Sequence, residues 1–497
     1  MQLLFSKAKD NSQTFSVDGI FFHSTYSPLK EAERFLQSIN FSLEPELLLF
    51  VEPGLNYYSD LLKKKFPQCK LICLRLFDQP LGDEESWDYC IKYSEITNLK
   101  SFLIKNFGEE KILSSNIIIT KQAESIFKNQ IDQIILQYKN ALEDSKTLLV
   151  TRQFFEKKWL INSCNFIKYA NHFCSRQFQT DLPVLVCASG PSLNSCIKII
   201  KENTSRLFII CLSSATSVLL QNDIIPDIVL TTDGGWWAGE HLKLLKKYKD
   251  IPLASPCEAF IPKCILQKNP IFTFEYNDSS SFISCEILKK AHIQGFSVLR
   301  NPTVSGTALS FAKAITKNSI YFCGLDLAGG KGQQHTKPNE IEKDNNLNDF
   351  RIKNIETRTS YSRYNSNSLH IYRDWFCELN DVDNVYRVID FENNKQGQLG
   401  KIKDISSKDF LKKIENLQPL SKANFFKLQD SSNNKSSSII DYICEQLKSP
   451  EWQKQIFPAD FISIKNCADE NQRKAFEERI NYKITKLIQK IRKLIDE

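Results

Sequence analysis

Residues 182–201 read LPVLVCASGPSLNSCIKIIK, and this stretch decides the fold class. Its apolar run predicts a buried strand, and the apolar spacing that follows Leu193 predicts a helix. Between them, Ser189-Gly190-Pro191-Ser192 forms a turn in which glycine permits close backbone approach and proline suits the first helical turn. The N–H groups that open a helix favour an anion, although an ordinary helix start uses the same residue types. The turn therefore predicts either a phosphate site or a plain helix start.

The same alternation of short apolar strands and helices continues along the chain. Further strands are predicted at 207–213, 227–232, 252–255, 271–275, 296–299, 319–327 and 386–391. This rhythm predicts an α/β fold whose central, Rossmann-like, mostly parallel sheet has helices on both faces. Residues 45–77 show a smaller strand–helix–strand pattern, in which the turn Glu52-Pro53-Gly54-Leu55 lacks the GxGxxG phosphate fingerprint. We therefore expect a smaller, degenerate α/β domain before the central sheet.

The remaining segments complete a four-part organisation. We expect the degenerate domain over 1–120, a helical connector over 121–180, the central domain over 181–400, and a linker with a helical domain over 401–497. Within these, 329–370 reads as a long loop or lid, and 393–407 and 428–438 as linkers. The amphipathic helices from 439 onward could also join chains into an oligomer.

Composition excludes several classes of protein. In 497 residues, 65 Lys and Arg face 58 Asp and Glu, and a net charge of +7 without a basic block argues against a nucleic-acid binder. The 15 cysteines lack the paired spacing of a structural zinc site, so we expect buried thiols in a reducing cytoplasm and no metal site. Neither a signal peptide nor a run of ~18 apolar residues is present, so we expect no membrane span.

Three further positions fall after predicted strands, where ligands of such sheets bind. Asp233 ends the strand DIVLTT beside two glycines and could hold a ribose hydroxyl or a metal, or cap the next helix. Ser305-Gly306-Thr307 opens the helix ALSFAKAITKN and, like the first turn, could hold a phosphate or serve as a cap. Asp326 lies at the end of the predicted strand SIYFCGLDL and could reach the same crevice.

Two of the six histidines lie in the polar stretch after Asp326, namely His335 and His370. Histidine suits a general base because its ordinary pKa is near neutrality, and either residue fits that role. Close to His370, Arg363 and Arg373 could clamp a carboxylate and Tyr361 could assist a departing phosphate. A packed aromatic and basic lid is the alternative for this cluster.

Three ordered motifs resemble the motility accessory factor (Maf-type) family of flagellin glycosyltransferases. They are VLVCASGPSLNSCIKIIKE, RLFIICLSSATSVLLQNDIIPDIVLTTD and VSGTALSFAKAITKNSIYFCGLDLAGGKGQQH. The resemblance extends upstream to FFEKKWLINSCNFIKY and downstream to YRVIDFENNKQGQLGKI, so it covers roughly residues 150–400. The central sheet is similar to that of bacterial sialyltransferases.

The resemblance implies a CMP-sugar enzyme that transfers a nonulosonic (sialic-acid-like) sugar to Ser or Thr of flagellin and requires no cofactor. It implies that Gly190, Pro191, Ser192, Ser305, Gly306, Thr307 and Asp326 bind the nucleotide and its phosphate. Ser189 and Asp233 complete the predicted nucleotide-binding set because they also follow predicted strands. The resemblance leaves His335 and His370 as alternative bases.

The same motifs are also similar to an MptE-like 6-hydroxymethylpterin pyrophosphokinase domain. That reaction transfers diphosphate from ATP and needs Mg²⁺, for which Asp233 and Asp326 would be the ligands. A third alternative is a non-catalytic flagellin-binding factor, which would keep the fold without using the histidines.

Overall fold

The computed structural model describes most of the chain as two compact units. The described residues are 2–79, 81–82, 84–96, 98–175, 178–276, 281–327, 335–348, 367–389, 398–420, 426, 428 and 436–496. Unit 1 consists of residues 1–154 and 453–485, and unit 2 of residues 155–452 and 486–497.

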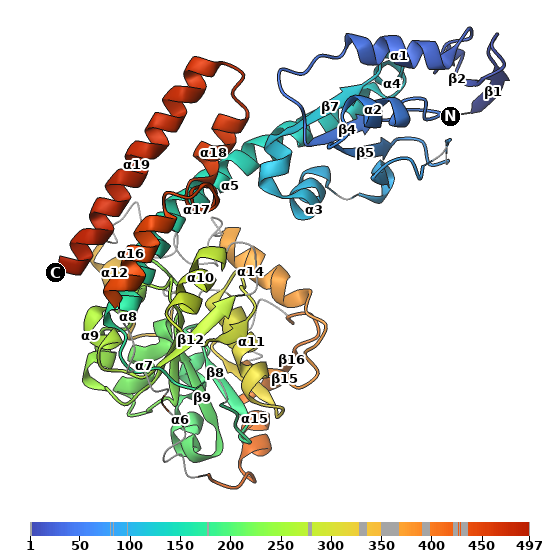
Figure 1. Ribbon diagram of the computed structural model, residues 1–497. Coiled ribbons are helices and arrows are strands. Elements are labelled where there is room, and N and C mark those ends of the chain that lie inside the picture. The colour runs from blue at the N-terminus through green and yellow to red at the C-terminus, as the bar shows by residue number, and fades with distance from the viewer. Residues whose placement is uncertain are drawn as a thin grey trace. The chain divides into compact units, whose positions relative to one another are not determined.

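Unit 1 contains a four-stranded parallel sheet in the order β6-β5-β4-β7 (Figure 1). Its strands are β4 (Leu47–Val51), β5 (Lys70–Arg75), β6 (Tyr89–Lys92) and β7 (Ser115–Ile119). Every residue of β4, LLLFV, is buried, as expected for a parallel strand covered on both faces. Helix α2 (Ser59–Lys65) connects β4 to β5, which confirms the strand–helix–strand pattern predicted for 45–77.

Unit 1 also contains elements that the sequence pattern did not indicate. A three-stranded antiparallel sheet is formed by β1 (Leu3–Lys7), β2 (Gln13–Val17) and β3 (Ile20–Phe21). The helices that lie wholly within unit 1 are α1 (Pro28–Ser38), α2, α3 (Leu99–Leu113), α4 (Lys121–Ile126) and α18 (Pro458–Lys465).

The turn after β4 is filled by side chains of unit 1 itself. Arg75 donates from Nη1 to Glu52 Oε1 at 2.9 Å and to the Gly54 carbonyl at 2.6 Å. The other oxygen of Glu52 accepts the N–H groups of Leu76 and Phe77. Glu52 and Arg75 have side-chain exposures of 0% and 1%, so the place that holds phosphate in an intact nucleotide fold contains a buried ion pair.

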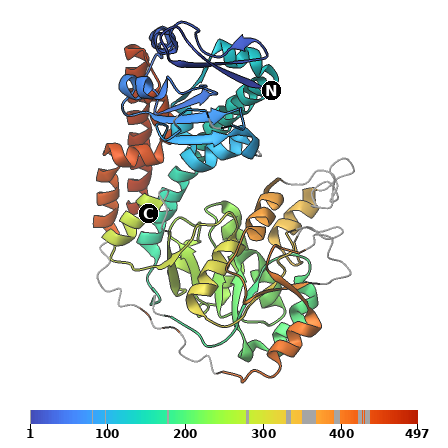
Figure 2. The same cartoon turned by 90° about the vertical axis from the view of Figure 1, so that its right-hand side faces the viewer.

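Unit 2 is built on a nine-stranded sheet in which all neighbouring strands are parallel (Figure 2). The order is β13-β12-β11-β10-β9-β8-β14-β15-β16. The strands are β8 (Val184–Cys187), β9 (Phe208–Leu212), β10 (Ile228–Leu230), β11 (Leu253–Pro256), β12 (Ile271–Tyr276), β13 (Phe296–Val298), β14 (Ile320–Cys323), β15 (Val385–Ile389) and β16 (Lys403–Ser406). Helices cover both faces, so the predicted fold class is confirmed.

Two segments of unit 2 differ from the sequence prediction. Residues 393–407 were predicted to be a linker, but β16 lies within them and pairs with β15, where Arg387 forms a bidentate ion pair with Asp404 at 2.7 and 2.6 Å. This edge strand reads KDIS and lacks the apolar run that marked the others. Residues 329–370 were predicted to be a loop or lid, but 340–348 form helix α12 (Glu340–Asn348), and helix α14 (Asn367–Cys377) begins near the end of the range.

The remaining helices of unit 2 lie between or after these strands in the sequence. They are α6 (Leu193–Glu202), α7 (Thr216–Gln221), α8 (Trp236–His241), α9 (Lys263–Leu266), α10 (Phe282–Lys290), α11 (Val304–Ile315), α15 (Ser407–Ile414) and α16 (Ser436–Gln446). Helix α11 contacts β8, β9, β13 and β14. It therefore crosses from the edge strand β13 to the middle of the sheet, which brings its first turn toward the loops that follow β8 and β14.

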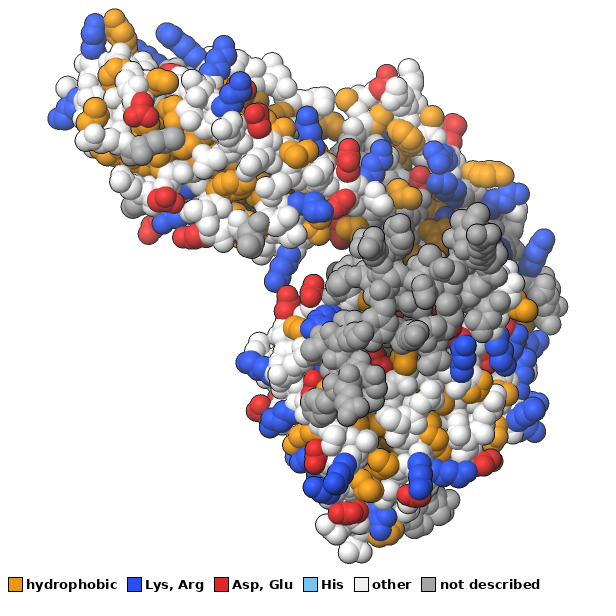
Figure 3. Space-filling view, turned by 180° about the vertical axis from the view of Figure 1, so that it is seen from behind, with side chains coloured by type: hydrophobic (Ala, Val, Ile, Leu, Met, Phe, Trp, Pro, Cys, Tyr) orange, Lys and Arg blue, Asp and Glu red, His pale blue; other side chains and the backbone are white. Residues whose placement is uncertain are grey.

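Three helices include residues of both units. They are α5 (Lys128–Tyr169), α17 (Pro450–Ile456) and α19 (Glu470–Asp496). Helix α5 is one continuous helix of 42 residues in the region expected to be a helical connector. None of the helices in the described ranges is both long and apolar enough to cross a membrane. On the face seen in Figure 3, Lys and Arg side chains are interspersed with Asp and Glu.

Candidate functional site

A cavity of about 480 Å³ lies where the loops after several parallel strands meet. Strands β9 and β14 flank β8, and the chain order reverses there, since β9 to β13 extend to one side and β14 to β16 to the other. Ligands of open parallel sheets bind at such a reversal, beyond the carboxyl ends of the strands. The lining residues are Ala188, Ser189, Gly190, Leu212, Ser214, Thr232, Asp233, Asn301, Pro302, Thr303, Val304, Ser305, Gly324, Leu325, Asp326, Leu327, His335, Leu369 and Tyr372.

The turn after β8 is packed tightly against the loop after β14. The N–H of Gly190 donates to the Gly324 carbonyl at 2.8 Å. A side chain at position 190 would place its first carbon 2.6 Å from Asp326 Oδ2, so only glycine fits this crossing. Ser189 lines the cavity and its hydroxyl accepts from Ser214 at 2.9 Å. The turn therefore presents Ser189 and Gly190 to the cavity.

The carboxylate of Asp326, from the loop after β14, lies at the start of helix α6. Its Oδ2 accepts the Ser192 N–H at 2.7 Å, and its other oxygen accepts the Ser192 hydroxyl. Burial raises the pKa of Asp326, although the two Ser192 donors and the positive charge of Arg387 oppose that rise. A carboxylate of the protein therefore already holds the anion position at this helix start, and Pro191 and Ser192 are outside the residues that line the cavity.

The start of helix α11 is differently equipped. The Thr303 side chain caps it by accepting the Gly306 N–H at 3.2 Å, and the first turn of this fully described helix contains no acidic residue. Ser305 lines the cavity, whereas Gly306 and Thr307 are buried behind it. A Cβ at Gly306 would come within 2.8 Å of Asn301 Cβ. This helix start, with first-turn N–H groups that the helix itself leaves unused, can receive an anion from the cavity.

Asp233 lines the cavity and follows Thr232 in the chain. Its Oδ1 accepts the Gly235 N–H at 2.8 Å, so the carboxylate closes its own turn before helix α8 begins at Trp236. Trp236 and Trp237 stack edge to face with ring centroids 4.9 Å apart. Within the described residues, no three His, Cys, Asp or Glu side chains gather in a way that could hold a metal ion.

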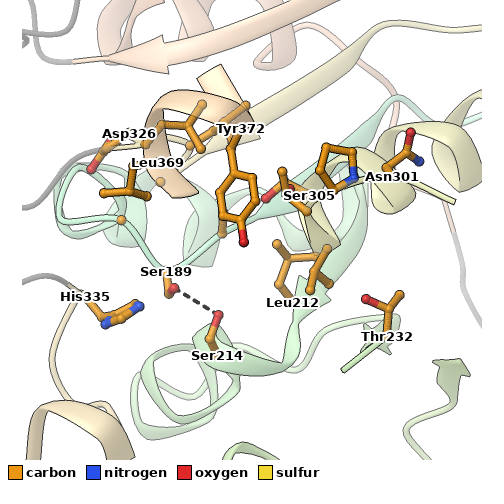
Figure 4. A pocket seen from close by; sticks show the side chains of 18 of the residues that line it. Ser189, Leu212, Ser214, Thr232, Asn301, Ser305, Asp326, His335, Leu369 and Tyr372 are labelled. Carbon is orange, nitrogen blue, oxygen red and sulfur yellow. Dashed lines mark hydrogen bonds between the residues drawn. The ribbon is translucent and has the colours of Figure 1, made fainter. Parts of the chain in front are cut away.

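His335 is the predicted base whose side chain lines the cavity. Figure 4 shows it beside Ser189 at one end, with Thr232 and Asn301 at the other end and Tyr372 between them. His370 lies on α14 (Asn367–Cys377), but its side chain is outside the described part of the structure, as are Tyr361 and Arg363 entirely. Arg373 follows Tyr372 on α14 and is not among the lining residues.

Sequence reasoning missed several lining residues and one partner of the site. Ser214 follows strand β9, so its position after a strand end could have indicated it. Tyr372 and Leu369 come from α14, for which no periodicity was recognised. The buried carboxylate of Glu342, which accepts from the backbone N–H of His335 at 3.0 Å, had no sequence signal because the turn that brings it back is irregular.

Comparisons with known proteins agree with this architecture. Residues 157–332 match the family model of 6-hydroxymethylpterin diphosphokinase MptE-like proteins. The solved structure of the Maf glycosyltransferase from Magnetospirillum magneticum AMB-1 is similar over 99% of this chain and 91% of that chain, with a TM-score of 0.56 and 13% identity. At that identity the likeness concerns the fold, and it confirms the resemblance drawn from the three motifs at the level of the fold.

A curated relative is an uncharacterized protein from Treponema pallidum (strain Nichols). It is 30% identical over 286 residues, which are 57% of this chain. The match spans 61% of that relative's own length.

Proposed function

We propose that this chain is a glycosyltransferase that moves a nonulosonic sugar from a CMP donor to a Ser or Thr hydroxyl of flagellin. The observation that carries the proposal is the cavity at the strand-order reversal. Its lining includes both the start of helix α11, whose first turn has no acidic residue, and the side chain of His335. The fold shared with a Maf glycosyltransferase supports the reaction class. The CMP donor, the sugar and the flagellin acceptor follow from the motif resemblance.

The reaction requires stabilisation of the leaving phosphate and a general base for the acceptor hydroxyl, and these residues can provide both. The bond between the anomeric carbon of the sugar and the phosphate oxygen breaks through an oxocarbenium-like transition state, and CMP leaves with its electrons. The N–H groups at the start of α11 and the Ser305 hydroxyl would stabilise that phosphate. The acceptor hydroxyl loses its proton to a general base as its oxygen bonds to the anomeric carbon, and His335 would take that proton.

The contacts at the two helix starts favour α11 over α6 as the phosphate site. The start of α6 is occupied by the Asp326 carboxylate, which would repel a phosphate, whereas the start of α11 has no such carboxylate in its first turn. We propose that Ser189, Gly190 and Asp233 contact the nucleoside part of the donor. Ser192 and Asp326 would then shape the wall of the site.

A thermal-shift screen against CMP, CDP, UDP, GDP and ATP, each with and without Mg²⁺, tests the proposal. A ligand at about 100 times its Kd adds roughly 2.7 kcal/mol of stability. We expect CMP to stabilise the protein without metal, after which transfer from a CMP-nonulosonic acid to purified flagellin is measured by mass spectrometry. Stabilisation by another nucleotide alone, or no transfer to flagellin, would contradict the proposal.

Charge substitutions locate the phosphate. Ser305→Asp places a carboxylate in the first turn of α11, where it suits the helix dipole but repels a phosphate. We expect this variant to lose CMP stabilisation while its own unfolding temperature is kept. Ser195→Asp in the first turn of α6, on an exposed position outside the lining, is the matched control and should bind CMP normally.

The MptE-like match gives a second candidate, a Mg²⁺-dependent pyrophosphokinase. Asp233 and Asp326 both line the cavity and would be its metal ligands. A shift with ATP that appears only when Mg²⁺ is added, and that disappears in Asp233→Asn, would place this function first. No shift with any nucleotide would favour a non-catalytic flagellin-binding role.

A further inference from the structure

The cavity histidine is backed by a buried carboxylate. His335 Nδ1 lies 3.3 Å from Glu342 Oε1, and the backbone N–H of His335 donates to the same oxygen at 3.0 Å. The Glu342 side chain is 1% exposed, whereas the His335 ring is 23% exposed and lines the cavity. Nδ1 of the ring therefore faces the buried Glu342 carboxylate, while the ring lines the cavity where substrate would bind.

The segment that carries both residues is fixed to the floor of the cavity. The Thr336 N–H donates to the Ser189 carbonyl at 2.7 Å, and the Thr336 hydroxyl donates to the Gly190 carbonyl. Asn339 donates to the Ser214 carbonyl at 2.9 Å and accepts the N–H groups of Ile341 and Glu342. The loop that presents His335 is thereby tied to the two strand-end turns that line the same cavity.

Resting on the proposed transferase function, we infer that Glu342 is a positioning residue that makes His335 the general base. With Nδ1–H donating to Glu342, the lone pair of Nε2 is available to take the proton of the acceptor hydroxyl. The carboxylate also stabilises the imidazolium that forms as the acceptor oxygen bonds to the anomeric carbon and CMP departs. After transfer, the proton leaves from Nε2 to solvent, so protons and electrons balance.

A second histidine–glutamate pair, whose glutamate also lies on α12, provides a matched control. His241 Nδ1 lies 3.3 Å from Glu340 Oε2, and Glu340 also accepts from the Ser217 hydroxyl. Neither His241 nor Glu340 is among the lining residues. The two pairs have the same residue types and the same distance of 3.3 Å between Nδ1 and the carboxylate oxygen, and both glutamates lie on helix α12 (Glu340–Asn348). They differ in that only His335 lines the cavity.

Nitrogen-15 spectra of the full-length protein labelled at histidine test the positioning without any substrate. The His335 signal is identified by its loss in His335→Gln. We expect the neutral ring of the wild type to carry its proton on Nδ1, and Glu342→Gln to move a measurable fraction of it to Nε2. Glu340→Gln should leave the His335 signal unchanged. An unchanged His335 signal in Glu342→Gln overturns the inference.

Steady-state transfer then tests the consequence for catalysis. His335→Gln should lower kcat by about 10²–10⁴-fold, the usual contribution of a general base. Glu342→Gln should lower kcat by about tenfold or more while KM for the CMP donor stays near the wild-type value, and Glu342→Asp should recover part of the loss. A fall in donor affinity with kcat unchanged would indicate a structural role and overturn the inference.

The two readouts separate the inference from the function on which it rests. If the wild type transfers no sugar, the proposed function fails, and the tautomer of His335 still decides whether Glu342 positions it. If the wild type transfers sugar and Glu342→Gln keeps the wild-type kcat, the inference fails and the function stands. Should Glu342→Gln fold poorly, Glu342→Asp provides both measurements with the charge retained.

Discussion

The turns after β4 in unit 1 and after β8 in unit 2 occupy the same place in two parallel sheets, and different groups fill the space beside them. After β4, Glu52 and Arg75 form a buried ion pair that also accepts and donates the backbone hydrogen bonds of the turn. After β8, Gly190 and Ser189 face a space of about 480 Å³. The comparison teaches that strand–turn–helix topology alone does not make a ligand site.

The difference lies in where each unit places its charged side chains. In unit 1 a strand residue, Arg75 of β5, points into the crevice and neutralises the Glu52 carboxylate there. In unit 2 the carboxylate beside the turn comes from the loop after the neighbouring strand β14: Asp326 accepts from Ser192 at the start of α6. The strand arginine Arg387 pairs bidentately with Asp404 on the adjacent strand β16. Arg387 is thereby held on the sheet and is not among the residues that line the cavity.

At neutral pH, the largest effect is expected from breaking the ion pair of unit 1. Arg75→Met leaves Glu52 buried without its partner, and such a loss costs about 3–5 kcal/mol. Urea unfolding, followed by hydrogen exchange in peptides of unit 1, measures it. Lys70→Met on the same strand breaks an exposed pair with Asp88 and should cost less than about 1 kcal/mol. Similar losses in the two variants would contradict the assignment of the buried pair as the element that holds this turn.

Replacing the glycine of each turn by alanine should have different consequences in the two units. Gly190→Ala would place a carbon 2.6 Å from Asp326 Oδ2, which displaces the cavity wall and should weaken CMP binding about tenfold or more, given about 1–3 kcal/mol of strain. Gly54→Ala would meet Phe22 at 2.8 Å with φ at +67°, which strains the interior of unit 1. Calorimetric titration with CMP should therefore separate them, with the Gly54 variant losing stability and keeping its affinity. Equal affinities in both variants would count against the cavity as the nucleotide site.

Much of this difference was visible in the sequence, and the rest depended on long-range packing. Apolar runs identified the predicted strands of the central sheet. The turn after β4 was expected to be degenerate because it lacks GxGxxG, whereas the Ser-Gly-Pro-Ser turn after β8 predicted a phosphate site or a plain helix start. Strand β16 escaped because KDIS has no apolar pattern and is held by the Arg387 pair from a neighbouring strand. Glu342 escaped because its link to His335 depends on an irregular turn anchored to Ser189 and Ser214, contacts that no local periodicity encodes.

Acid should affect unit 1 through His23. Burial and the positive charge of Arg75 lower the pKa of His23 from 6.5 to about 3, and its Nε2 accepts the Leu55 N–H at 2.8 Å. Between pH 6.5 and 3, His23 is protonated in the unfolded chain but stays neutral in the folded unit. The free energy of unfolding therefore falls as pH falls through this range, by about 1.4 kcal/mol per pH unit. Urea unfolding monitored in unit 1 should show a shallower loss in His23→Gln, which keeps an acceptor. His172→Gln, at an exposed position, should leave the slope unchanged, and an unchanged slope in His23→Gln would refute the linkage.

The smallest effect, and of the opposite sign, is expected from Asp326 in unit 2. Burial raises its pKa above 3.8, so between that value and the folded-state value the native protein holds a proton that the unfolded chain releases. Its contribution to stability therefore declines as pH rises through that window. Asp326→Asn, which cannot ionise, should gain stability relative to the wild type over the same rise in pH, whatever constant offset the altered contact with Ser192 produces. Asp250→Asn at an exposed position is the control. If the stability of the wild type instead rises relative to that of Asp326→Asn, the Ser192 donors and Arg387 outweigh burial. The start of α6 would then favour a negative charge, which contradicts the assignment of this helix start to the wall of the site.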